Sequence, residues 1–159
     1  MTEGDSDGIF EFGVPFGIAR RSGWRYPMSG VLLAPEAPAL VLEPSERAPS
    51  LARGHLVERF RELGIKDDFV GRLVVTELVT NAYTHVGVGH IVLRIFPDVC
   101  DDLVVIEVWD QGAGEPVVRG EDGDAEGGRG LLLIDQLVHD WGVRPLNEEG
   151  KVVWARCAR

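Results

Sequence analysis

Long apolar runs and excess basic charge are both missing from this 159-residue sequence. No stretch approaches the roughly 18 apolar residues that a membrane span needs, so no membrane partner is expected. Lys and Arg number 16 against 26 Asp and Glu, which gives a formal net charge of -10. Direct nucleic-acid binding is therefore not expected, because it depends on cations that neutralise phosphates. The acidic start "MTEGDSDGIFEFG" lacks the basic residues of a secretion signal, and we expect a cytoplasmic protein.

Cysteine is scarce too, with only Cys100 and Cys157 in the chain. They form no CxxC pair, so we expect small buried or half-buried thiols in a reducing compartment, and no disulfide framework. His85 and His90 are five residues apart, which is a poor spacing for metal ligands and does not predict a zinc site.

Residues 1–38 also lack hydrophobic periodicity. They are rich in Gly, Pro and isolated aromatic residues and are interpreted as an N-terminal extension of low intrinsic order. From residue 39 to residue 159 the pattern is regular, which predicts one folded domain.

The regular part predicts a short strand, two helices, two strands, a Gly- and acid-rich loop, a helix and two final strands. The predicted ranges are 39–43, 49–63, 67–86, 90–96, 103–110, 129–137, 140–145 and 151–157. Gly64 and Gly87 are expected to end the first two helices. This order predicts an α+β fold, a two-layer α/β sandwich with a mixed, mostly antiparallel sheet and helices on one face.

The stretch "ELVTNAYTH" places polar side chains in an otherwise apolar helix. At 100° per residue, Glu77, Asn81 and His85 share one stripe of the helix surface. A lone Glu is commonly a solvated surface residue, and that alternative stays open. On a nearly all-round apolar helix, however, an unpaired carboxylate would cost several kcal/mol unless a cation or polar ligand met it. Mg²⁺ with phosphate is one such ligand.

Two glycine-containing motifs follow. In "WDQGAGEP", Asp110 ends a strand and precedes Gly112 and Gly114, so its carboxylate could accept a hydrogen bond from a ligand amino group. Asp- and Gly-rich turns are common, so this motif alone is weak. In "EGGRGLLLIDQL", glycines run into a helix, where free N–H groups and the helix dipole favour phosphate. A plain helix-entry loop is the alternative reading.

The fixed order of the three motifs resembles the N, G1 and G2 boxes of the GHKL ATP-binding superfamily. "LVVTELVTNAYTH", "IEVWDQGAG", "GGRGLLLIDQLVHDWGV" and "GKVVWARC" are similar to the anti-sigma-factor serine kinases of the RsbW and SpoIIAB type. The resemblance covers residues 39–158 and implies the Bergerat-type fold of that superfamily.

The resemblance implies a role for each matching residue. Glu77 would be the general base toward a serine hydroxyl, and Asn81 would ligate the Mg²⁺ on the ATP phosphates. Asp110 would hold the adenine amino group, and residues 115–127 would form the lid. The residues that would bind ATP and its metal ion are Asn81, Asp110, Gly112, Gly114, Gly128, Arg129 and Gly130.

The chain departs from the pattern at Thr84 and Glu126, where relatives often carry Arg, and its lid segment "RGEDGDAEGG" holds four acids and one base. Two hypotheses follow. One is a serine/threonine kinase acting on an anti-anti-sigma (STAS) protein and controlling a sigma factor, with a possible homodimer. The other is a non-catalytic, nucleotide-gated regulator of a partner. A sensor histidine kinase would need a phosphoacceptor His upstream, and residues 1–54 contain none.

Overall fold

A computed structural model describes residues 37–98, 100–112, 129–146 and 150–159. The elements are β1 (Leu40–Leu42), α1 (Ala48–Glu62), α2 (Phe69–His85), β2 (Ile91–Pro97), β3 (Leu103–Asp110), α3 (Arg129–Leu137), β4 (Asp140–Pro145) and β5 (Lys151–Ala158). Most of residues 1–38, the predicted extension, lies outside the described residues. In the described part of the chain, no helix is long and apolar enough to cross a membrane.

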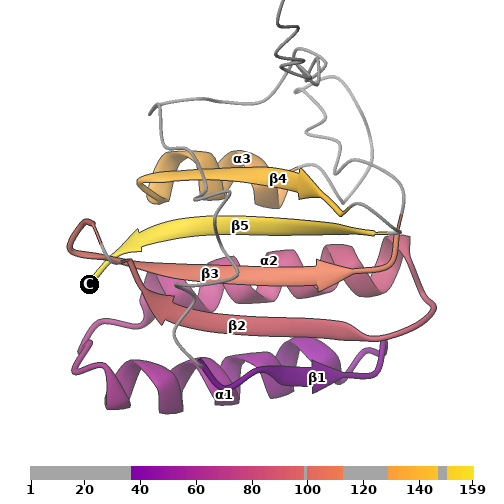
Figure 1. Ribbon diagram of the computed structural model, residues 1–159, viewed down its shortest axis with the longest axis horizontal. Helices are drawn as coiled ribbons and strands as arrows, with labels where there is room; N and C mark the ends of the chain where they lie inside the picture. Colours follow the sequence, from indigo (N-terminus) through magenta and orange to yellow (C-terminus); the bar gives the residue numbers. More distant parts are fainter. Residues whose placement is uncertain (1–36, 99, 113–128, 147–149) are drawn as a thin grey trace, which may run out of the picture.

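The five strands form one sheet in the order β1-β2-β3-β5-β4 (Figure 1). Every pairing among the described strands is antiparallel, so the α+β prediction is confirmed, although the sheet described here is not mixed. β3 pairs with β5 and not with β4, because α3 carries the chain across the sheet before β4 begins. This pairing places Asp110 directly opposite Lys151.

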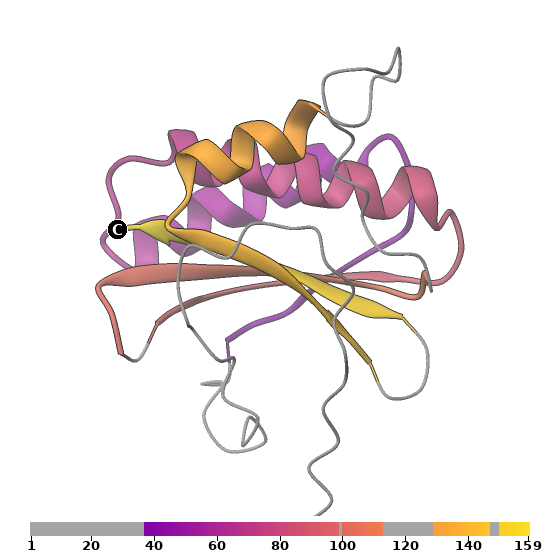
Figure 2. The same cartoon turned by 90° about the horizontal axis from the view of Figure 1, so that it is seen from above.

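The helices cover one face of the sheet, which gives the predicted two layers (Figure 2). Alternate residues of β3, Val104, Ile106 and Val108, are buried in the core between the layers, as the two-residue period of a strand requires. α1 and α2 pack closely, because a Cβ at Gly71 would lie only 2.7 Å from the Phe60 ring. The core thus fixes α2 above the central strands.

Several predicted boundaries hold. β3, α3 and β4 begin and end at the predicted residues, and Gly64 and Gly87 follow their helices with φ of +72° and +64°, values that favour glycine. α2 begins two residues later than predicted. Asp67 accepts a hydrogen bond from the Phe69 N–H (3.0 Å), so its side chain satisfies a free donor of the first turn from outside the helix.

The two cysteines differ in exposure. Cys157 is buried, and this burial raises the pKa of its thiol to about 12. Cys100 is exposed and also free, so the expectation of a buried or half-buried thiol is wrong there. Cys100 lies in the turn before β3, where its N–H donates to Asp98 (2.8 Å) and its side chain has no core to enter.

Candidate functional site

α2 carries the first two predicted site residues. Glu77 and Asn81 are half-buried and one turn apart, whereas His85, the third residue of the stripe, is exposed. Burial raises the pKa of the Glu77 carboxyl above its ordinary value, because desolvation disfavours the charged form. Among the described residues, no hydrogen-bond partner is found for either side chain. Both are therefore available to a ligand.

Glu77 lies against the first turn of α3. A Cβ at Gly130 would collide with the carboxylate of Glu77, so only glycine allows this approach. Gly130 is the second residue of α3, where helix N–H groups are free and the helix dipole is positive. The contact joins the first motif to the third. It places a carboxylate beside a helix end that can bind an anion.

The end of β3 forms the second part of the site. Asp110 is only 4% exposed, and its Oδ1 accepts hydrogen bonds from the Gly112 N–H (2.9 Å) and from Lys151 Nζ (2.8 Å). Lys151 Nζ also donates to the Gly112 carbonyl (3.3 Å). β5 begins here, at the right of Figure 1. We call the group of Asp110, Gly112 and Lys151 the open end of β5.

Three segments meet at the open end. A Cβ at Gly112 would lie 2.5 Å from Val86 Cγ2, just after α2. Gly89 and Gly150, with φ of +74° and +96°, lie against Gln111 and the Asp110 carbonyl respectively. The turn after α2, the end of β3 and the start of β5 are thus in direct contact.

α2 connects the two parts of the site. Glu77 contacts α3, and Val86, nine residues later, contacts the open end. At about 1.5 Å per residue, the two contacts lie about 14 Å apart along the helix axis. The candidate site thus has two parts along α2, a carboxylate beside the start of α3 and a second carboxylate at the open end.

Gly114, Gly128 and the lid segment 115–127 lie outside the described residues. Arg129 is the first residue of α3. Among the predicted residues that are described, Glu77 lies against Gly130, and Asp110 lies against Gly112. Asn81 lies one turn along α2 from Glu77.

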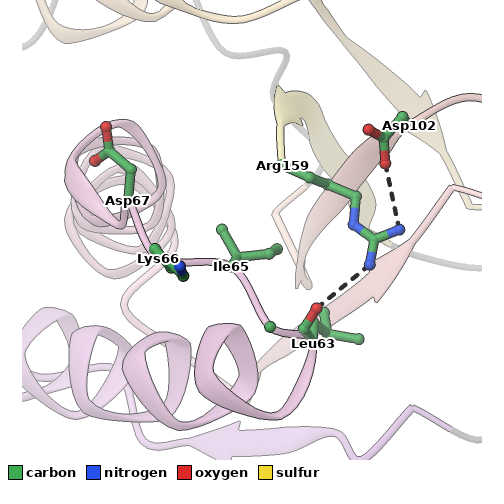
Figure 3. A pocket seen from close by; sticks show the side chains of 7 residues that line it. Leu63, Ile65, Lys66, Asp67, Asp102 and Arg159 are labelled. Atoms are coloured by element: carbon green, nitrogen blue, oxygen red, sulfur yellow. Dashed lines mark hydrogen bonds and ion pairs between the residues drawn. The ribbon is translucent and has the colours of Figure 1, made fainter.

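A surface hollow of about 460 Å³ lies away from these residues (Figure 3). It is lined by the turn after α1, by Asp102 and by Arg159. Arg159 donates to the Leu63 carbonyl (3.4 Å) and pairs with Asp102 (3.5 Å), so its guanidinium is already engaged. None of the predicted site residues lines this hollow, and it is not the candidate site.

Sequence reasoning missed Lys151. It is the first residue of an otherwise apolar strand, and its partner Asp110 is 41 positions away. The signal in the sequence was a cation at the start of one strand and a carboxylate at the end of another. When β3 and β5 pair in antiparallel register, these two side chains lie opposite each other.

Residues 45–157 match the family described as "Histidine kinase-like ATPase domain". The match covers most of the chain, so this protein belongs to that family of GHKL-type ATP-binding domains. No curated protein matches the chain.

Proposed function

We propose that the protein is an ATP-dependent serine/threonine kinase of the RsbW and SpoIIAB anti-sigma-factor type. It would transfer the ATP γ-phosphate to a serine or threonine of an anti-anti-sigma (STAS) partner and so control a sigma factor. The observation that carries this proposal is the position of Glu77, half-buried and in contact with Gly130 at the start of α3. Phosphate bound at that helix end would lie beside a carboxylate.

Glu77 suits a general base. The serine oxygen would attack the γ-phosphorus, the bond from phosphorus to the β,γ-bridging oxygen would break, and the hydroxyl proton would pass to Glu77. Burial raises the pKa of this carboxyl, which makes it a better proton acceptor near neutral pH. Phosphoryl transfer needs little beyond such positioning and charge stabilisation.

Asn81 would hold Mg²⁺ through its amide oxygen. The described residues contain no group of three or more His, Cys, Asp or Glu that could hold a metal ion. Mg²⁺ at Asn81 would therefore take its other ligands from phosphate and water, which is its ordinary behaviour in phosphoryl-transfer sites. When bound, the metal would neutralise phosphate charge.

A non-catalytic, nucleotide-gated regulator is the second candidate. The four acidic residues between 119 and 128 favour it, because they would repel a triphosphate. Such a protein would bind ATP and a partner, with little or no transfer. The two candidates differ only in whether Glu77 moves a proton.

The test compares Glu77→Gln and Asn81→Ala with a control, Glu58→Gln, at an exposed position of α1. Calorimetry measures the Kd for ATP with and without Mg²⁺, and radiolabel transfer to candidate STAS proteins measures the rate. Glu77→Gln should slow transfer about 10²–10⁴-fold with the Kd unchanged. Asn81→Ala should lose the Mg²⁺-dependent part of binding.

Each contrary result has a separate meaning. Transfer that is equally fast in Glu77→Gln would refute the base assignment. ATP binding without transfer by the wild type, to any STAS protein, would favour the regulator. No ATP binding at all would refute both candidates.

A further inference from the structure

Lys151 and Asp110 form a buried ion pair at the open end. They are cross-strand partners in register, and both lie on the helix-covered face, since Asp110 is two residues from the core residue Val108 and Lys151 is two residues from the core residue Val153. The whole residues are 9% and 4% exposed, and Nζ lies 2.8 Å from Oδ1. A buried pair of this kind needs good geometry to offset desolvation.

The two oxygens of Asp110 are in different situations. Oδ1 accepts from both Lys151 Nζ and the Gly112 N–H. Within the described part of the chain, Oδ2 accepts no hydrogen bond. An ionised carboxylate can accept about four, so Oδ2 keeps its full capacity for a ligand donor.

Lys151 also fixes the orientation of this carboxylate. Its ammonium bridges Oδ1 and the Gly112 carbonyl (3.3 Å), while Gly112 returns its own N–H to Oδ1. Rotation of the Asp110 side chain would break two hydrogen bonds to Oδ1 at once. The opposite formal charges of Lys151 and Asp110 lie 2.8 Å apart, so each offsets the other at this buried position.

We propose that Lys151 is a positioning residue that holds Asp110 through Oδ1 and so presents Oδ2 to the exocyclic amino group of a purine. This inference rests on the proposed nucleotide site. Its consequence is a preference for ATP over inosine triphosphate, which carries a carbonyl oxygen in place of that amino group. The carbonyl cannot donate, and it would face a carboxylate oxygen that Lys151 prevents from turning away.

The experiment measures the Kd of ATP and of inosine triphosphate by calorimetry on four full-length proteins. They are the wild type, Lys151→Met, Lys151→Arg and Lys66→Met, the last at an exposed lysine. The wild type should prefer ATP by about 10–100-fold, the range of one charge-assisted hydrogen bond. Lys151→Met should lose most of this preference, whereas Lys151→Arg and Lys66→Met should keep it.

The ratio of the two Kd values separates a positioning role from a merely structural one. If Lys151→Met weakens both nucleotides equally and keeps the wild-type ratio, the inference is overturned. If the wild type binds both equally, Oδ2 does not read the amino group, and the inference fails while ATP binding stands. That second measurement needs no variant, so misfolding of Lys151→Met leaves the inference testable. If the wild type binds neither nucleotide, the proposed function itself fails.

Discussion

Each end of β5 buries a cation, one beside a single carboxylate and the other among three, and the two ends differ in how fully the charges are paired. At the open end, Lys151 holds one oxygen of Asp110. At the other end, Arg156 donates to both oxygens of Asp140 (2.6 and 2.7 Å), and also to Asp98 (3.1 Å) and Asp101 (2.8 Å). We call these four residues the closed end.

The closed end has the features of a structural cluster. Arg156 is 1% exposed. Burial alone lowers the pKa of its guanidinium, but the hydrogen bonds to Asp140, Asp98 and Asp101 outweigh this effect and raise it. A bidentate pair to Asp140 leaves a ligand little to bind. The comparison teaches that a carboxylate with both oxygens paired is a structural support, whereas a buried Asp residue with one oxygen left unpaired is a candidate for ligand binding.

Among the variants that test this contrast, Arg156→Met should have the largest effect on stability. It would leave the buried carboxylates of Asp98 and Asp140 without their cation, and removal of one partner from a buried ion pair typically costs about 3–5 kcal/mol. Urea unfolding should show this loss, and ATP affinity of the folded fraction should not change. Arg61→Met, at an exposed position of α1, should change stability by less than about 0.5 kcal/mol. A similarly small effect at Arg156 would contradict the structural role.

The next test adds one methyl group at the open end. In Gly112→Ala the new Cβ would lie 2.5 Å from Val86 Cγ2 and 3.0 Å from Asp110 Oδ1. Overpacking of this kind costs about 1–3 kcal/mol, and it should also weaken ATP binding because Asp110 must move. Gly54→Ala is the matched control, since nothing lies within 4 Å of its Cβ in α1. That change should stabilise by about 0.5–1 kcal/mol. Equal unfolding midpoints for the two variants would refute the tight contact.

The contrast between the ends also explains what the sequence could predict. Local patterns were enough for β3, α3 and β4, whose bounds match, because alternation and glycine signals act within a few residues. The resemblance gave Glu77 and Gly130 separate roles at one nucleotide site, but nothing in the sequence predicted that they lie in contact. Both ion clusters were missed, because they depend on pairing across the sheet.

The closed end shows most clearly why ion pairs across the sheet are hard to predict from sequence. Arg156 and Asp98 are 58 positions apart in the chain. No local period connects them, and only the order β3-β5-β4 brings Asp98, Asp140 and Arg156 to one end of the sheet. A net charge of -10 gave no hint of which carboxylates are buried. The sheet register is therefore the information that sequence reasoning lacked.

The change Glu77→Gln should have the smallest of the three effects on stability. It tests whether the unpaired carboxylate of Glu77 lowers the stability of the fold. Burial raises the pKa of Glu77 in the folded protein above its pKa in the unfolded protein. As the pH rises, the unfolded state therefore loses the proton of this carboxyl first. Stability from this group is therefore full at acid pH and falls as the pH passes through the folded pKa. In Glu77→Gln that fall disappears, so the stability of the variant relative to the wild type should increase as the pH rises above the ordinary glutamate pKa of about 4.3. Urea midpoints at several pH values measure it, and a pH-independent difference would show that Glu77 is already compensated in the folded protein.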